Sequence, residues 1–173
     1  MWDEKFAQLA LFVAGWSKDR STQVGAVIVN SDRCVVSVGY NGAPRGFNDE
    51  LEVVHQRPDK YFYVEHAERN AIYNANRVSV STKDCIMYVT HPPCADCARA
   101  IVQSGITKVF FVNPMHERWS DSLSAAKLIF EQCGVATRQI QVSSPASMSA
   151  QYYPSPRRLS TRWFAWLPWV RNL

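Results

Sequence analysis

The sequence predicts an α/β domain in which a central five-stranded sheet carries helices on both faces. Two observations lead to this prediction. Stretches with helical apolar spacing alternate with short runs rich in β-branched residues, and the order is helix, two strands, then three helix–strand repeats. The first two strands can pair antiparallel, whereas the later ones need crossover helices, so we expect a mixed sheet.

The first half of the domain is predicted to be a helix followed by a hairpin. Residues 2–16 place large apolar side chains at helical spacing. The runs VGAVIVN (24–30) and CVVSVGY (34–40) are joined by SDR, which is typical of two paired strands. A loop rich in turn residues follows at 41–46, and the polar, irregular stretch 47–63 gives no firm prediction.

The second half alternates between helices and strands. Helices are expected over residues 65–78, 95–104 and 120–133, and strands over residues 85–90, 108–113 and 135–142. Gly105 follows the second of these helices and Gly134 the third, a common way for a helix to end. We therefore place the folded domain at residues 1–142.

Residues 143–173 differ in composition from the domain. They form a Pro/Ser-rich linker and then a tail rich in Trp and Arg. We expect this tail to dock on its own or a neighbouring subunit, with a helix on a membrane surface as the alternative. Four arginines beyond residue 150 account for the net charge of +4, because residues 1–150 hold 15 basic and 15 acidic side chains. A neutral body argues against a nucleic-acid partner.

The chain shows no predicted membrane span, and its acidic start differs from a signal peptide. Five cysteines, an odd number, argue against a disulfide framework and for a reducing compartment, so we expect a cytoplasmic protein. Cys34, Cys85 and Cys133 lie in apolar runs or near a helix end, and are expected to be small buried thiols.

Two fragments carry reactive side chains, EHAERNA at 65–71 and HPPCADC at 91–97. Each opens a predicted helix, where the helix dipole favours a thiolate. His66, Cys94 and Cys97 form a ligand set suited to one Zn²⁺, and the fourth position is left for water. A redox CxxC pair or a core histidine would be the ordinary alternatives. Neither would account for both fragments together.

Glu68 is not needed as a ligand, so we expect it to move protons. Zinc lowers the pKa of a bound water to about 7. Glu68 could then take that proton, pass it to N3 of a pyrimidine, and deliver a second proton to the amine leaving C4.

The chain resembles the deoxycytidylate (dCMP) deaminases of the cytidine deaminase superfamily over about residues 1–142. His66-x-Glu68 with Pro93-Cys94-x-x-Cys97 matches the zinc deaminase signature. Further matching stretches are SKD at 17–19, VGAVIV at 24–29, GYNG at 39–42, PRG at 44–46 and ERW at 117–119. The resemblance implies a three-layer α/β/α cytidine deaminase-like fold. It also implies hydrolysis of dCMP to dUMP and ammonia, which supplies dUMP for thymidylate synthesis.

The resemblance also implies roles for residues around the substrate. Asn41 would hydrogen-bond the sugar, and the loop with Lys18, Asp19 and Arg20 would meet the 5′-phosphate. An anionic phosphate needs nearby cations or helix N-termini. For Lys18 and Arg20, a solvated loop charge is an equally good interpretation.

Three further residues would contact the base or close the site. By resemblance, the backbone of Ala67 would contact the base and that of Pro93 the leaving amine. Trp119 would help to close the pocket, with a place in the core as the alternative.

Family members are often hexamers that dCTP activates with Mg²⁺ and dTTP inhibits. Gly42, Arg45 and Gly46 keep the appearance of the loop near the effector site. Many regulated members hold a second zinc before the first metal motif. Here residues 47–63 offer only His55 and no cysteine, so one zinc per subunit is predicted.

Other functions remain open from the sequence. The substrate could be another cytosine species, such as dCTP or 5-methyl-dCMP, or a cytosine or adenine in a nucleic acid. The chain could also be a non-catalytic zinc-binding module. Glu68 argues against the latter, because a structural zinc site has no use for a carboxylate that is not a ligand.

Overall fold

Five strands form one mixed sheet in the computed structural model, which describes residues 1–114 and 119–143. The strand order is β2-β1-β3-β4-β5. β1 pairs antiparallel with β2 and with β3, whereas β3 pairs parallel with β4 and β4 with β5. The prediction of a mixed five-stranded sheet is therefore confirmed.

The elements follow the predicted order and lie close to the predicted bounds. The strands are β1 (Gly25–Val29), β2 (Val35–Tyr40), β3 (Ile86–Val89), β4 (Lys108–Phe111) and β5 (Ala136–Gln139). The α-helices are α1 (Trp2–Ala14), α2 (Ala67–Arg77), α3 (Ala95–Gln103) and α4 (Ser120–Gln132). β5 is shorter than the predicted 135–142, and all four of its residues are exposed at the edge of the sheet.

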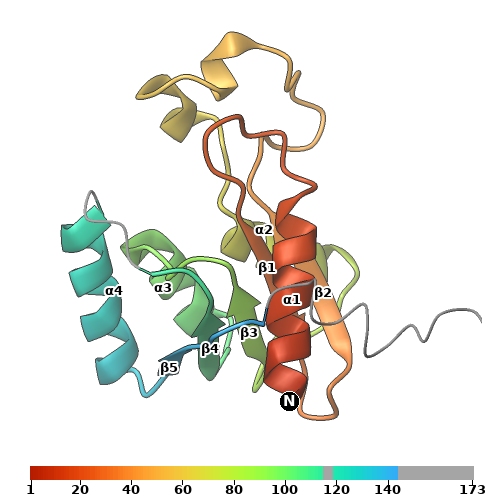
Figure 1. Cartoon of the computed structure of the whole chain (residues 1–173), viewed down its shortest axis with the longest axis vertical. Coiled ribbons are helices and arrows are strands. Elements are labelled where there is room, and N and C mark those ends of the chain that lie inside the picture. Colours follow the sequence, from red (N-terminus) through yellow and green to blue (C-terminus); the bar gives the residue numbers. More distant parts are fainter. Residues whose placement is uncertain (115–118, 144–173) are drawn as a thin grey trace, which may run out of the picture. The chain divides into compact units, whose positions relative to one another are not determined.

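Helices cover both faces of the sheet, as the sequence predicts (Figure 1). Every side chain of β1 is buried, and successive residues of a strand face opposite sides. Val27 and Val29 pack in the cluster that includes Phe6 of α1. Ala26 and Ile28 pack in the larger cluster, which contains residues of α2, α3 and α4. The three layers are thus α1, the sheet, and the other three α-helices.

Gly39 of β2 allows α2 to lie directly against the sheet. A Cβ atom at this position would overlap the backbone nitrogen of Ala71 and the carbonyl oxygen of Ala67. These are backbone atoms of a helix, so they have little freedom to move aside. The helix that begins beside His66 is thereby fixed in depth relative to the sheet.

Residues 47–63, for which the sequence gives no firm prediction, contain two short 3₁₀ helices, η1 (Glu52–Val54) and η2 (Asp59–Phe62). In Figure 1 this segment lies at the top, beyond the end of the sheet. Its irregular shape explains the lack of periodicity, since turns of three or four residues leave no repeating apolar pattern.

The expectation of buried thiols holds for Cys85 but is wrong for two other cysteines. Cys85 is 2% exposed. Cys34 and Cys133 are exposed. Cys34 directly precedes the edge strand β2, and Cys133 directly follows the last turn of α4. Both positions lie just outside an element, beyond the residues of that element that pack against a neighbour.

Residues Met1–Val142 form one compact unit. The Pro/Ser-rich linker and the Trp/Arg-rich tail predicted for 143–173 lie outside the described residues from 144 onward, so they remain predictions. Among the described residues, no helix combines the length and the apolar character needed to cross a bilayer.

Candidate active site

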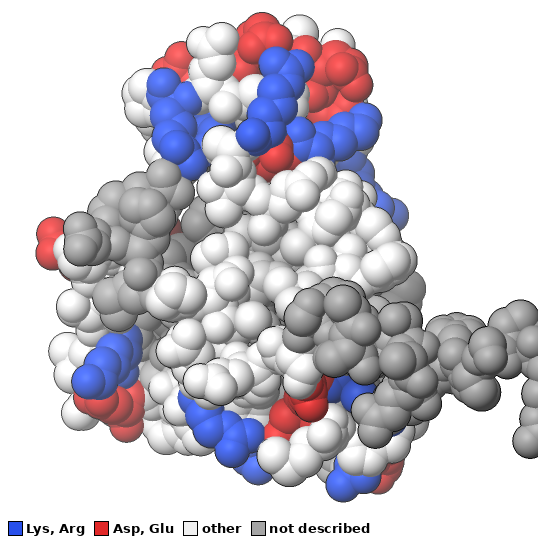
Figure 2. Space-filling model, in the orientation of Figure 1, with Lys and Arg blue, Asp and Glu red and all other residues white. Residues whose placement is uncertain are grey.

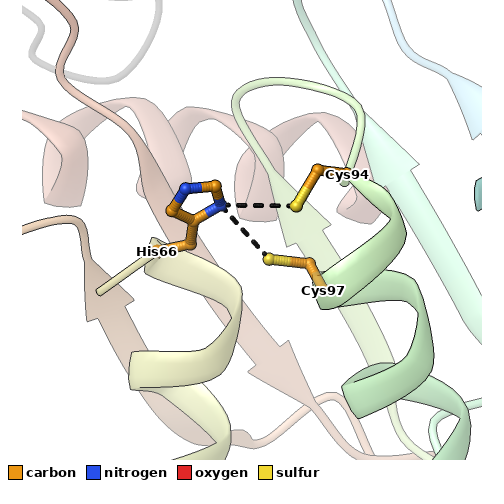
Figure 3. Close-up of side chains that lie close together, drawn as sticks. All are labelled: His66, Cys94 and Cys97. Carbon is orange, nitrogen blue, oxygen red and sulfur yellow. Dashed lines mark hydrogen bonds between the residues drawn. The ribbon is translucent and has the colours of Figure 1, made fainter. Parts of the chain in front are cut away.

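The three predicted ligands come together at the N-termini of two neighbouring helices. His66 is the N-cap of α2, Cys94 is the N-cap of α3, and Cys97 lies in the first turn of α3. Both helices pack on the same face of the sheet, which brings their first turns side by side. Figure 3 shows the imidazole of His66 pointing at both sulfur atoms. Sequence spacing put each residue at a helix start, and the shared face brought the starts together.

The distances within this cluster suit a tetrahedral zinc ion. Nδ1 of His66 lies 3.5 Å from Sγ of Cys94 and 3.4 Å from Sγ of Cys97. Zinc bonds of about 2.3 Å to sulfur and about 2.0 Å to nitrogen at tetrahedral angles place the two ligand atoms about 3.5 Å apart. The three ligand atoms all lie within 4.8 Å of one another. These residues could therefore hold a metal ion with one position left open.

The proton affinities of the three groups also suit a cation. The hydrogen bond with Cys94 raises the pKa of His66 to about 9, against the opposing effect of burial. The hydrogen bond with Cys97 lowers the pKa of Cys94 to about 4. That same bond, together with burial, raises the pKa of Cys97. The three side chains thus compete for protons, and a divalent cation would replace those protons and hold both sulfurs as thiolates.

Glu68 lies in the first turn of α2, two residues after His66, and is 4% exposed. Burial raises its pKa above the ordinary value for a glutamate. A carboxyl group that is not a metal ligand can act as a general acid and base in a reaction beside the metal. Glu68 stands outside the cluster of metal-ligating atoms, yet it lines the same cavity as His66 and Cys94.

A cavity of about 440 Å³ opens onto the cluster, large enough for a mononucleotide. Elements far apart in the sequence build its wall: the loop after α1, the segment 57–64, the starts of α2 and α3, and the start of α4. The lining residues are Asp19, Ser21, Thr22, Val24, Asn41, Arg57, Lys60, Tyr61, Val64, His66, Ala67, Glu68, His91, Pro92, Cys94, Pro114, Trp119 and Leu123.

The structure separates the three residues of the predicted phosphate loop. Asp19 lines the cavity, whereas Lys18 and Arg20 do not. Lys18 and Arg20 are exposed, and each makes an ion pair at 2.9 Å, with Asp49 and Glu52 respectively. Figure 2 shows positive and negative side chains interleaved in this upper part of the molecule. The interpretation of Lys18 and Arg20 as surface charges fits their positions better than a place in the pocket.

Asn41 lines the cavity and also fixes the loop beside it. Its side-chain oxygen accepts a hydrogen bond from the backbone of Val24 at 2.7 Å. Its amide nitrogen donates to the carbonyl of Thr22 at 2.9 Å and to Asp19 Oδ2 at 3.3 Å. Both donors are used within the protein, so what Asn41 can offer a sugar hydroxyl is the second lone pair of its oxygen.

The residues predicted to surround the base are placed differently from one another. Ala67 and Trp119 line the cavity, but Pro93 does not, and its neighbour Pro92 lines it instead. The Trp119 ring meets Tyr61 edge-on at 5.8 Å and His66 edge-on at 6.5 Å between centroids. This position between the metal cluster and the segment 57–64 is a wall position rather than a place in the core.

The predicted effector loop does not contribute to this cavity. Arg45 donates a hydrogen bond to Asn74 at 2.5 Å and lines a separate hollow of about 400 Å³. Gly42 pairs with Glu65 in an isolated β-bridge, and Gly46 has a φ of +84° in a turn. Neither glycine lines the hollow that Arg45 lines.

Sequence reasoning missed the cavity residues of the segment 57–64, chiefly Arg57, Lys60 and Tyr61. Lys60 is 4% exposed, and its Nζ lies 2.6 Å from Oδ2 of the equally buried Asp19. The two residues are 41 positions apart, and the polar stretch around Lys60 has no periodicity. No signal in the sequence alone marks this lysine as buried.

A partly buried His–Cys–Cys cluster beside a carboxylate, in a cavity of nucleotide size, is the kind of site that zinc-dependent hydrolases use. Residues 1–113 match the family model of the cytidine and deoxycytidylate deaminase zinc-binding region. The chain therefore belongs to this family of zinc-dependent hydrolytic deaminases.

Known relatives agree with this assignment. The deoxycytidylate deaminase of Homo sapiens is 43% identical over 143 residues, which covers 80% of this chain and 79% of the human protein. A probable deoxycytidylate deaminase of Caenorhabditis elegans is 41% identical over 136 residues, covering 75% of this chain and 68% of that protein. The crystal structure of dCMP deaminase from the cyanophage S-TIM5, in complex with dCMP and dUMP, superposes with a TM-score of 0.66. It is 30% identical and covers 79% of this chain and 95% of that chain.

Proposed function

We propose that this enzyme hydrolyses dCMP to dUMP and ammonia. The observation that carries the proposal is the juxtaposition of the His66–Cys94–Cys97 cluster with Glu68 in one cavity of about 440 Å³. The human relative named deoxycytidylate deaminase and the phage enzyme that binds dCMP and dUMP support this choice of nucleotide. His66, Cys94 and Cys97 would hold one zinc ion in each subunit.

Held by His66, Cys94 and Cys97, a zinc ion would lower the pKa of a water molecule and so supply hydroxide as the nucleophile near neutral pH. Glu68 accepts a proton from this water and transfers it to N3 of the cytosine, which makes C4 more electrophilic. As the water oxygen bonds to C4, Glu68 carries the second proton to the amino group. The C4–N bond then breaks, ammonia leaves, and a C4 carbonyl remains. Glu68 is suited to this exchange by its place, because it is buried and lines the cavity beside the metal-ligating residues without being one of them.

Asn41 would accept a hydrogen bond from the sugar hydroxyl, Ala67 would contact the base, and Trp119 would shield it from solvent. All three line the cavity. The backbone of Pro93 would contact the leaving amine, and its neighbour Pro92 lines the cavity.

The family resemblance supports finer proposals. A dCTP–Mg²⁺ activator and a dTTP inhibitor would act through the loop of Gly42, Arg45 and Gly46. The subunits would assemble as a hexamer, and the enzyme would work in the cytoplasm and supply dUMP for thymidylate synthesis. Measuring dCMP turnover with and without dCTP, dTTP and Mg²⁺ tests the regulatory part separately from the chemistry.

Ammonia release from a panel of dCMP, dCTP, 5-methyl-dCMP, cytidine and cytosine tests the substrate. We expect dCMP to give the highest kcat/KM. The variant Glu68→Gln keeps the shape of the side chain but removes its proton transfer. It should bind zinc in the same ratio as the wild type while kcat falls by about 10²–10⁴-fold. A zinc-loaded Glu68→Gln enzyme with near-normal turnover of dCMP would overturn the role given to this residue.

A further inference from the structure

The loop 17–23 and the segment 57–64 form one wall of the cavity. This wall carries two cationic side chains. They are Arg57 and Lys60. Lys60 is buried and neutralised, because its Nζ lies 2.6 Å from Asp19 Oδ2. Arg57 makes no ion pair with any carboxylate in the part of the chain that the structure describes. It is therefore the cavity cation whose charge is not balanced within the protein.

The guanidinium of Arg57 is held at the cavity by one hydrogen bond. Its Nη2 donates to Ser21 Oγ at 3.2 Å. The same hydroxyl accepts a bond from Lys60 Nζ at 2.7 Å and donates to Asp19 Oδ1 at 2.8 Å. Asp19 also accepts from the backbone of Ser21 and of Thr22. A buried ion pair thus fixes the serine, and the serine in turn positions the arginine.

This arrangement leaves most of the guanidinium free for a ligand. An arginine side chain has five N–H donors in a planar fork, and Arg57 uses one nitrogen in its bond to Ser21. The fork fits two oxygens of a phosphate at once, and such charge-assisted bonds are about twice as strong as neutral ones. Lys18 and Arg20, in contrast, already face Asp49 and Glu52 and lie outside the lining.

The balance of charge points to an anion rather than a neutral ligand. The carboxylate and amine of the Asp19–Lys60 pair cancel, and the other acidic residue of the lining, Glu68, lies at the start of α2 beside the metal-ligating residues rather than beside Ser21. Arg57 then leaves one positive charge on the wall that carries Ser21. A cytosine nucleotide whose C4 reaches the metal cluster has its phosphate at the far end of the molecule, beyond the sugar.

We propose that Arg57, positioned by Ser21 and the buried Asp19–Lys60 pair, binds the 5′-phosphate and selects a nucleoside monophosphate over the free nucleoside. The inference rests on the proposed function, since it assigns the phosphate end of the same substrate. Arg57 is a specificity-determining residue, and Asp19 and Lys60 are positioning residues that act through Ser21.

The test compares Arg57→Gln with Arg20→Gln as a matched control. Both arginines are exposed and neighbour the cavity wall, but Arg20 pairs with Glu52. Steady-state kinetics are measured for dCMP and for deoxycytidine. We expect Arg57→Gln to lower kcat/KM for dCMP by about 10–100-fold, mainly through KM, and to leave deoxycytidine within about twofold. Arg57→Lys keeps the positive charge but lacks the planar fork, so its kcat/KM for dCMP should lie between those of Arg57→Gln and the wild type. Arg20→Gln should match the wild type.

A binding measurement separates this inference from the proposed reaction. Calorimetric titration of the zinc-loaded protein with dUMP, and competition by inorganic phosphate, report the phosphate site without turnover. Loss of dUMP affinity in Arg57→Gln but not in Arg20→Gln supports the inference even if dCMP is not the preferred substrate. Equal dUMP affinity in Arg57→Gln and the wild type, no dUMP binding by the wild type, or an equal fall for dCMP and deoxycytidine would each overturn it. Failure of dCMP turnover with an intact dUMP site would overturn the proposed function alone.

Discussion

Replacing Lys60 with methionine removes the charge that faces Asp19 while keeping a side chain of similar length. The two side chains are 5% and 4% exposed, and their charged atoms lie 2.6 Å apart. Burial alone would raise the pKa of Asp19, but the hydrogen bonds from Lys60, Ser21 and Thr22 outweigh it and lower the value to about 2. The carboxylate is therefore charged at pH 7, and the variant would leave it buried without its partner.

Removing one partner of a buried ion pair costs about 3–5 kcal/mol of stability. In a protein of this size each kcal/mol lowers Tm by about 2–4 °C, so we expect Lys60→Met to melt roughly 6–20 °C below the wild type at pH 7. The folded pKa of Asp19 lies below its ordinary value of 3.8, so its contribution is present above about pH 4 and is lost toward pH 2. The difference in Tm between Lys60→Met and the wild type should therefore become smaller as the pH falls from about 4 toward 2.

Thermal unfolding followed by circular dichroism measures these differences. Lys18→Met is the control, because Lys18 is exposed and pairs with Asp49, and its Tm should stay within about 2 °C of the wild type. The double variant Asp19→Asn/Lys60→Met keeps an oxygen for the backbone N–H groups of Ser21 and Thr22 but removes the stranded charge. It should regain a large part of the lost Tm. The reasoning is refuted if Lys60→Met and Lys18→Met have the same Tm, or if the Tm of the double variant is no higher than that of Lys60→Met.

Two further substitutions test the metal cluster and the packing that carries it. Cys97→Ala should abolish zinc binding and dCMP turnover, whereas Cys34→Ala, at an exposed cysteine, should preserve both. Zinc content is measured by metal analysis after gel filtration, and turnover by ammonia release. A Cys97→Ala protein that still holds zinc would contradict the ligand assignment. Gly39→Ala should lower the free energy of unfolding by about 1–3 kcal/mol or more, because the new Cβ forces the backbone of α2 away from β2. Gly42→Ala is the control, since a Cβ there meets open space. Equal denaturation midpoints for the two variants would show that α2 moves aside without strain.

The sequence predicts the order of the elements because that order depends on local periodicity. Residues 120–133 show helical spacing with Gly134 after them, and the structure has α4 at Ser120–Gln132. The cysteines show where this reasoning stops. Cys34 begins an apolar run and Cys133 lies near the end of a helical one, yet both are exposed, because burial depends on which neighbouring element covers a position.

The candidate site divides in the same way. His66 and Glu68 lie two positions apart, and Cys94 and Cys97 three, so the start of each helix sets the spacing within each pair. The packing of α2 and α3 on one face of the sheet then brings the two pairs together. The proposed phosphate end behaves differently, because it depends on charge pairs and hydrogen bonds between the loop 17–23 and the segment 47–63. Lys18 and Arg20 are the cations that the sequence suggests, but Asp49 and Glu52 neutralise them on the surface.

By itself, the sequence predicted the order of the elements and the candidate zinc ligands, because helical spacing and the spacing within each metal-binding fragment are local, and the resemblance of its motifs indicated a zinc deaminase. Only the tertiary structure decided which charges face the cavity. Lys60 looks in the sequence like any solvated lysine of a polar stretch, but it is buried because Asp19, 41 positions earlier, supplies the opposite charge. Charge pairs between residues far apart in the sequence leave no periodic pattern. Only the folded structure therefore shows that Arg57 has no carboxylate partner among the described residues.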